Sequence, residues 1–281
     1  MVLFRGVRRA VMTIVLTVLA PAASFAVSLP ANADPIVQIS SRGQSIRAVL
    51  LMPPGAPKGS VILFAGGNGR LDITGGGTIT KLSGNQLVRT RAMYQDKGYI
   101  TLVPDLAPDM KVGADGVTSG YRSSPEYAAD VGAMVAHLRT LSRKRVTAIG
   151  TSRGSISVAN AISKLRGRKR PHAAVYTSAF LKLDCSDLNI WCIVNGDASL
   201  LDVPSLVVWH VKDKCPATPP SAVPVFKAWW EGGTGDVLAQ RAFRGGLPPE
   251  SADCEAKSPH GFWGLDTQVV KAITAWVKTV P

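Results

Sequence analysis

The residues best suited to chemistry form the pentapeptide Gly150-Thr151-Ser152-Arg153-Gly154. The apolar segment 145–149 before it predicts a strand, and the small-residue segment 155–162 after it predicts a helix. A G-x-S-x-G between a strand and a helix is typical of a nucleophile elbow, a turn so tight that only small flanking residues avoid clashes. Such a turn would aim the Ser152 hydroxyl at helix N–H groups, which can stabilise an oxyanion.

An acid and a base follow this serine along the chain. Asp213 comes after the apolar segment 205–211, and His260 stands in the loop sequence 258–263. A serine hydroxyl needs a base to remove its proton during attack, and an imidazole, which titrates near a pKa of about 6.5 in model peptides, can take up and return that proton. We therefore predict His260 as the base and Asp213 as the group that orients it. His210, inside the strand before Asp213, is the alternative base.

Two backbone segments are candidates for an oxyanion hole. One donor would be the amide of Arg153, directly after the nucleophile. The other would come from the glycine-rich segment 65–69, where the sequence leaves the choice between Gly67 and Asn68 open. Glycines at this place let a substrate approach the backbone closely. A site of this kind needs neither a metal nor an organic cofactor, and we expect none.

On these motifs the chain resembles the α/β-hydrolase superfamily, and in particular its small single-domain esterases of the dienelactone hydrolase kind. The resemblance rests on the elbow and on the chain order serine, acid, histidine, and it covers most of the chain after residue 33. It implies a three-layer α/β sandwich with a mostly parallel central sheet. The chain departs from the superfamily at Ala65-Gly66, where His-Gly is common.

The hydrophobic pattern along the chain predicts the same architecture. Strands are expected at 36–40, 45–52, 61–64, 99–103, 145–149, 173–177, 205–211 and 237–243, and helices at 85–97, 124–141, 155–162, 223–230 and 266–278. Apolar strands that alternate with helices predict a parallel sheet covered on both faces. We therefore expect one domain over residues 34–281, with segment 181–203 as a small cap insertion. Aromatic candidates for an acyl pocket are Trp191, Phe262 and Trp263.

Residues 1–33 have the pattern of a secretory signal peptide. Three arginines precede the apolar run 10–20, and residues 31–33, Ala-Asn-Ala, form a cleavage site. Pro21 interrupts the apolar run, which is shorter than the roughly 20 residues of a membrane-spanning helix. An uncleaved anchor is therefore the less favoured alternative. We expect an exported mature protein that begins at Asp34 and resides in the periplasm or outside the cell.

The cysteine content fits export. Four cysteines in an exported chain indicate two disulfides, and the four are Cys185, Cys192, Cys215 and Cys254. Of the three pairings, we favour Cys185 with Cys192 and Cys215 with Cys254. The second bond would tie the loop of the acid to the loop of the histidine, although spacing alone leaves the pairing open.

The charge of the chain indicates possible partners. The formal net charge is +13, and loss of the three leader arginines lowers it to +10. Basic exported proteins tend to associate with anionic envelope polymers or lipid headgroups, whereas we expect no specific binding of nucleic acid. The densest basic run, 164–170, falls at the predicted end of a helix, where cations favour the helix dipole. A solvated helix end is the first interpretation of that run.

Together these features predict an exported serine hydrolase that cleaves a carboxylic ester through an acyl-enzyme. The expected substrate is a small-molecule or polymeric ester. A peptidase or an acyltransferase of the same fold is a variant of this hypothesis. The alternative from a different class is a catalytically silent envelope-binding protein, which would have no need of a complete triad.

Overall fold

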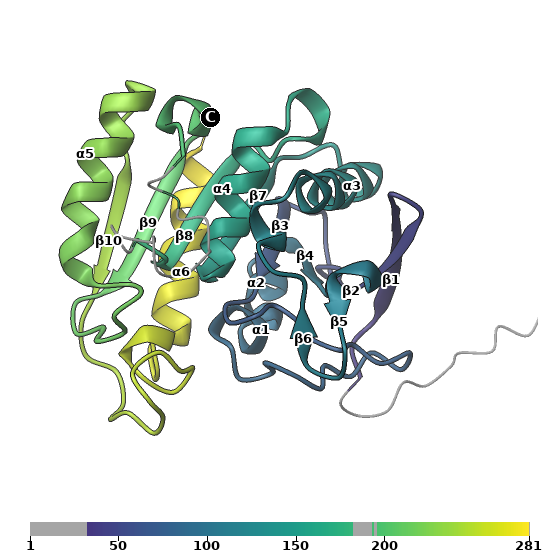
Figure 1. Ribbon diagram of the computed structural model, residues 1–281, viewed down its shortest axis with the longest axis horizontal. Coiled ribbons are helices and arrows are strands. Elements are labelled where there is room, and N and C mark those ends of the chain that lie inside the picture. The colour runs from purple at the N-terminus through teal and green to yellow at the C-terminus, as the bar shows by residue number, and fades with distance from the viewer. Residues whose placement is uncertain (1–32, 182–192, 194–195, 281) are drawn as a thin grey trace, which may run out of the picture.

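The computed structural model describes residues 33–181, 193 and 196–280 of the chain. Within this part, eight strands form one sheet in the order β1-β2-β4-β3-β7-β8-β9-β10, and a separate hairpin pairs β5 with β6 (Figure 1). The strands are β1 Ile36–Ser41, β2 Gln44–Leu51, β3 Gly59–Phe64, β4 Tyr99–Pro104, β5 Lys111–Val112, β6 Gly116–Val117, β7 Val146–Ser152, β8 Ala173–Ala179, β9 Ser205–His210 and β10 Ala239–Phe243. The α-helices are α1 Gln86–Arg89, α2 Arg91–Asp96, α3 Pro125–Leu141, α4 Gly154–Lys164, α5 Val223–Thr234 and α6 Asp266–Thr279.

The central sheet is mostly parallel. β1 and β2 pair antiparallel, as do β2 and β4, whereas all pairs from β4 through β3, β7, β8 and β9 to β10 are parallel. Every residue of β3, β4 and β8 is buried, which explains why these strands are almost continuously apolar. The predicted α/β fold with a mostly parallel central sheet is therefore confirmed.

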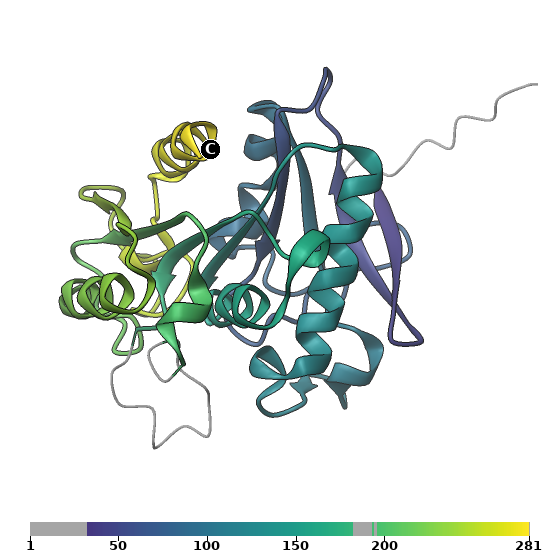
Figure 2. The same cartoon turned by 90° about the horizontal axis from the view of Figure 1, so that it is seen from above.

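Helices cover both faces of the sheet. One hydrophobic cluster joins the sheet to α3, α4 and α5, and a second joins its other face to α1, α2 and α6. Figure 2 shows the yellow α6 on the opposite side of the sheet from the teal and green helices. This arrangement gives the three layers that the sequence predicts. Because parallel strands run the same way, the loops after β3, β7 and β9 meet at one edge of the sheet.

Most predicted element boundaries lie within a few residues of the structure, and one helix differs. The predicted helix 85–97 is two short helices, α1 and α2, that meet at Thr90. The Thr90 hydroxyl donates to the carbonyl of Gln86 at 2.7 Å. A threonine side chain that bonds to nearby backbone competes with regular helix geometry, which accounts for the break.

Helix α3 begins where the sequence predicts. Ser124 is the N-cap of α3, and its side chain accepts a hydrogen bond from the amide of Tyr127 at 3.1 Å. Pro125 occupies the first turn, where its missing N–H costs nothing. The helix ends at Leu141, and the chain returns through the sheet as β7, the strand that carries Ser152.

Two of the predicted segments are only partly covered by the described residues. The predicted signal peptide, 1–33, lies outside them except for residue 33, and most of the predicted cap, 181–203, lies outside as well. Residues 198–201 form the short 3-10 helix η6, capped by the Asp197 side chain. In the part of the chain that is described, no helix combines the length and the apolar character needed to cross a membrane.

Candidate active site

Ser152 sits on a strained turn between β7 and α4. Its φ is +52°, in the left-handed region that residues with a side chain rarely adopt. A Cβ on Gly150 would lie 2.2 Å from the carbonyl oxygen of Gly154, and one on Gly154 would lie 2.2 Å from that of Phe64. Only glycine fits at either place. The pentapeptide therefore has the geometry expected of a nucleophile elbow.

The turn is further held by hydrogen bonds from a buried serine. The hydroxyl of Ser155 donates to the carbonyl of Ser152 at 2.6 Å and accepts from the amide of Phe180 at 2.9 Å. It thereby links the first turn of α4 to the chain that follows β8. Strained backbone persists where the surroundings fix it in this way, and it clusters at functional sites.

His260 and Asp213 form a buried pair. Nδ1 of His260 lies 3.0 Å from Oδ2 of Asp213, and the two residues are only 5% and 6% exposed. A carboxylate can only accept, so Nδ1 carries the proton and Nε2 is left as a base. The structure thus brings the predicted base and the predicted acid into contact, 47 residues apart in sequence.

Two hydroxyl groups that sequence reasoning missed support this pair. The Thr218 hydroxyl donates to Oδ2 of Asp213 at 2.9 Å and lies 3.0 Å from Nδ1 of His260. The Ser178 hydroxyl donates to the backbone carbonyl of His260 at 2.7 Å. Both contacts depend on tertiary packing between distant segments, and no local sequence signal marks either residue.

A disulfide joins the two loops that carry the acid and the base. Cys215 and Cys254 are bonded, with their Cα atoms 4.6 Å apart. The amide of Cys215 also donates to Oδ1 of Asp213 at 2.9 Å, so both carboxylate oxygens have partners. The favoured pairing of these two cysteines is confirmed. The other predicted pair, Cys185 with Cys192, lies outside the described residues.

Ser152 and His260 open into one pocket. This pocket, of about 330 Å³, is lined by Ser152, His260, Gly66, Gly67 and residues 82–86 and 254–256, among others. The Ser152 hydroxyl forms no hydrogen bond with His260, although both are within the described part of the chain. Hydrogen bonds between catalytic groups often tighten only when substrate binds. The pocket therefore contains both the predicted nucleophile and the predicted base, so that one substrate could contact both.

The loop after β3 runs directly beside the nucleophile. A Cβ on Gly66 would come within 3.1 Å of the Ser152 Cβ, and Gly67 has a φ of +54°. The amides of Gly67, Asn68 and Arg153 donate no hydrogen bond to any described residue. Gly67 lines the Ser152 pocket, whereas Asn68 and Arg153 line a neighbouring pocket that also includes Gly67. These positions suit Gly67 better than Asn68 as an oxyanion donor.

A buried arginine holds that loop in place. The Arg122 guanidinium, on a residue that is 6% exposed, donates to the carbonyl of Ala65 at 2.9 Å and that of Gly67 at 3.2 Å. It also donates to the Ser157 hydroxyl on α4 at 2.6 Å. Hydrogen bonds from a charged donor are stronger than neutral ones. Arg122, also missed by sequence reasoning, therefore fixes the loop that would bind the oxyanion.

His210, the alternative base, has a structural role. His210 is 1% exposed, its Nδ1 accepts from the amide of Lys212 at 3.0 Å, and its Nε2 lies 3.1 Å from the carbonyl of Gly245. Both ring nitrogens are thus used to hold the loops after β9 and β10. His210 does not line the Ser152 pocket, so the alternative base is excluded by geometry.

The predicted aromatic acyl pocket is wrong for the described residues. Phe262 is fully buried and packs edge-on against Phe243, with ring centroids 5.9 Å apart. The Trp263 ring lies near the cations of Arg89 and Lys257, at 5.4 and 5.2 Å. Trp191 lies outside the described residues. Neither described aromatic lines the Ser152 pocket, because Phe262 packs into the core and Trp263 lies against these two cations.

Comparison with solved structures identifies the fold. The chain is similar to an α/β serine hydrolase without a lid from Xanthomonas campestris, with a TM-score of 0.53 and 13% identity over 88% of this chain and 97% of that one. It is also similar to Est1E from Butyrivibrio proteoclasticus, solved with ferulic acid bound, with a TM-score of 0.57 and 16% identity over 86% and 97%. A third similar structure is an esterase from Pyrococcus furiosus, with a TM-score of 0.54 and 15% identity over 87% and 90%.

These structural neighbours share the architecture described above and little sequence. No protein-family model matches the chain, and no curated protein matches it. The chain has the α/β-hydrolase fold, as its motifs predict. At such low identity the likeness establishes the fold, and the chemistry has to be argued from the site.

Proposed function

We propose that this protein is an exported serine hydrolase that cleaves carboxylic esters through an acyl-enzyme. The observation that carries the proposal is that Ser152, on its strained turn, lines the same pocket as His260 of the buried His260–Asp213 pair. A fold that only bound ligands would have no need of this combination. The hydrolases and esterases among the structural neighbours favour the same chemistry.

In this proposal each residue has a role in two half-reactions. As the Ser152 oxygen attacks the ester carbonyl carbon, Nε2 of His260 takes the hydroxyl proton. Asp213 stabilises the imidazolium that forms. When the tetrahedral intermediate collapses, His260 returns the proton to the departing alcohol. Water then attacks the acyl-enzyme by the same route, which releases the carboxylic acid and restores Ser152.

The developing oxyanion needs N–H donors fixed in advance. We assign this role to the amide of Arg153, directly after the nucleophile, and to the amide of Gly67, in the loop beside Ser152. Neither amide has another acceptor among the described residues. Of the two loop candidates, Asn68 is the less favoured because only Gly67 lines the Ser152 pocket. Arg122 would act indirectly by holding the carbonyls of the same loop.

The experiment that tests the proposal is turnover of short-chain nitrophenyl esters by the purified, oxidised protein. Ser152→Ala should lower kcat by a factor of about 10⁴ or more while leaving the fold unchanged. Ser163→Ala is the matched control, because that hydroxyl caps a carbonyl at the end of α4 away from the pocket. Turnover that survives in Ser152→Ala would refute the proposal.

The second candidate function is a binding protein that keeps the fold without catalysis. It predicts no hydrolysis of any ester or amide by a correctly folded protein. A panel of ester and amide substrates, with folding checked by circular dichroism, separates the two candidates. Selective turnover of amides, or transfer of the acyl group to an alcohol in place of water, would instead identify the peptidase or acyltransferase variant.

Export is the part of the proposal that rests on the leader sequence and on the Cys215–Cys254 bond, since disulfides persist in oxidising compartments. Cleavage after Ala33 should leave Asp34 as the mature N-terminus. N-terminal sequencing of the protein recovered from the periplasm or culture medium tests this directly. Recovery of the uncleaved chain in the membrane fraction would contradict it.

A further inference from the structure

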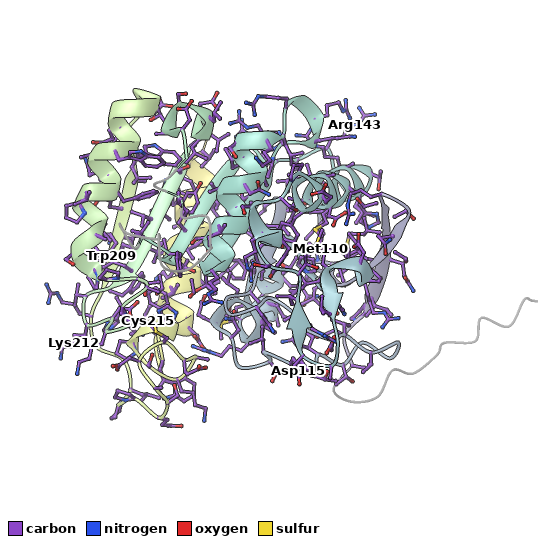
Figure 3. All side chains as sticks on the ribbon, in the orientation of Figure 1. Met110, Asp115, Arg143, Trp209, Lys212 and Cys215 are labelled. Carbon is purple, nitrogen blue, oxygen red and sulfur yellow. A yellow bond between two sulfur atoms is a disulfide. The ribbon has the colours of Figure 1, made fainter. Side chains whose placement is uncertain are left out.

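A cationic pocket lies at the edge of the sheet opposite to the candidate active site. It has a volume of about 370 Å³ and is lined by Arg139, Arg143, Arg168 and His172. These residues come from the end of α3, the loop after it, the 3-10 helix η3 (Gly167–Lys169) and the start of β8. Figure 3 shows Arg143 at one end of the molecule and Cys215, in the acid loop, toward the other.

Two hydrogen-bond donors face each other in this pocket. Nδ1 of His172 accepts from the amide of Val146 at 3.0 Å, so the proton of the neutral ring is on Nε2. That Nε2 lies 3.2 Å from Nη2 of Arg139. Arginine has donors only, so these two nitrogens cannot satisfy each other. Nη2 of Arg139 also donates to the carbonyl of Arg170 at 3.4 Å, whereas Nε2 of His172 has no acceptor among the described residues. An acceptor placed between them would satisfy both.

A second donor in the pocket also has no partner. Nε of Arg139 is buried and makes no hydrogen bond within the described part of the chain. A buried polar group without a partner is costly, and native structures rarely leave one unless a water, ion or ligand completes it. Two nitrogens of neighbouring side chains, Nε of Arg139 and Nε2 of His172, thus point to a missing acceptor.

The charges of the pocket point to an anion as that acceptor. None of its four lining side chains pairs with a carboxylate among the described residues. Burial, together with the neighbouring Arg139 and Arg145, lowers the pKa of His172, and burial with Arg168 lowers that of Arg139. The cations therefore repel one another when the pocket holds no counter-charge.

The helix dipole alone does not account for this arrangement. Cations near the end of α3 are favoured by its dipole, and that effect explains exposed side chains such as Arg143. It does not explain why Nε of the half-buried Arg139 is buried without a partner while Nη2 lies against another donor. Of the basic run 164–170, which was predicted to be a solvated helix end, only Arg168 lines the pocket. The solvated helix end remains the interpretation for the other basic residues of the run.

We propose that this pocket binds a phosphate group. A phosphate offers three or more acceptor oxygens and up to two negative charges, which match three arginines and a histidine donor. The adjoining surface extends the positive charge, because Arg143 also lines a second hollow with Lys58, Lys144, Arg145 and Lys278. The phosphate could therefore be a free ion or part of an anionic lipid headgroup. This site is independent of ester hydrolysis at Ser152.

The test uses inorganic phosphate and the His172 ring as a reporter in nuclear magnetic resonance titrations of the full mature protein. Bound phosphate should shift the ring resonances and raise the apparent pKa of His172, because it supplies the counter-charge. The double substitution Arg143→Gln with Arg168→Gln should weaken binding at least about 10-fold, since it removes two charge-assisted contacts. Both side chains are exposed, so the fold should be retained, and ester turnover should be unchanged.

The matched control is Arg241→Gln with Arg244→Gln, which removes two exposed charges near the end of β10. Phosphate affinity that is kept in the control and lost in the pocket variant supports the site. Absence of any shift in the wild-type protein, or equal weakening in both variants, overturns it. If phosphate binds, co-sedimentation with phosphatidylglycerol vesicles then identifies the source. Vesicle binding lost only in the pocket variant indicates a lipid headgroup, and absence of vesicle binding indicates a free phosphate species.

Discussion

Cys215 and Cys254 link the loop of the acid to the loop of the base. Cys215 follows Asp213 by two residues and donates its amide to that carboxylate, while Cys254 lines the pocket that contains Ser152 and His260. The bond closes a sequence separation of 39 residues. The disulfide thereby restrains the position of Asp213 relative to that of His260.

Removal of this bond should cost both stability and activity. The double substitution Cys215→Ala with Cys254→Ala should lower the free energy of unfolding by about 2–4 kcal/mol, because the unfolded chain regains the entropy of the open loop. It should also lower kcat, since the two loops lose their common restraint. Denaturant unfolding and ester kinetics measure the two effects. Unchanged values of both would show that the bond has no role in the site.

The Thr218 hydroxyl is expected to position the acid and the base. Thr218→Val removes the donor to Oδ2 of Asp213 while keeping the shape of the side chain, and it should lower kcat about 10-fold. Thr218→Ser keeps the hydroxyl and should recover most of the activity. A purely structural role would instead lower stability without changing kcat at saturating substrate, and steady-state kinetics with a pH profile distinguish these results.

The steric constraint on the turn around Ser152 can be tested by comparing alanine substitutions at two glycines, Gly154 and Gly55. Gly154→Ala places a methyl group 2.2 Å from the carbonyl oxygen of Phe64, so it should destabilise the fold by about 1–3 kcal/mol and abolish turnover. Gly55 lies in an open loop where an added Cβ meets nothing within 4 Å. Gly55→Ala should change stability by less than about 1 kcal/mol. Equal effects of the two substitutions in thermal unfolding would contradict the packing argument.

An ion pair near the β1–β2 turn should make part of the stability depend on pH. Arg42 donates to Asp109 at 2.8 Å and to the buried Asp130 at 2.7 Å, and the first of these contacts lowers the pKa of Asp109. A carboxylate with a lowered folded-state pKa stabilises the fold above its unfolded value of about 3.9 and loses this contribution as the pH falls.

The expected effect of Asp109→Asn is therefore a small loss of stability, up to about 1 kcal/mol, at neutral pH. The difference between variant and wild type should shrink as the pH falls below about 4. Thermal unfolding across this pH range measures it. A difference that stays constant, or grows in acid, would show that the ion pair does not contribute in this way.

How far the sequence predicts the site depends on how local each signal is. The elbow could be predicted because its strand, turn and helix are adjacent in sequence. Glycine stands at positions 150 and 154 because any larger residue there would collide with a backbone carbonyl oxygen. Asp213 and His260 could be predicted from their order and from the strand and loop before them. Thr218, Ser178 and Arg122 could not, because their roles arise only when segments 30 or more residues apart come together.

The fold was predicted more completely than the pockets. Apolar strands and capped helices such as α3 leave a periodic pattern, whereas the break at Thr90 depends on one side-chain hydrogen bond. The aromatic residues Phe262 and Trp263 show the same limit. They were predicted as candidates for an acyl pocket, but Phe262 packs against Phe243 in the core and Trp263 lies near Arg89 and Lys257.

The most direct test of the proposed chemistry is covalent labelling with a fluorophosphonate probe, followed by mass spectrometry of the peptides. Such a probe reacts only with a serine that a base activates and an oxyanion hole serves. The account predicts one adduct, on Ser152, that disappears in His260→Ala. A folded, oxidised protein that remains unlabelled, or that is labelled at another serine, would contradict it.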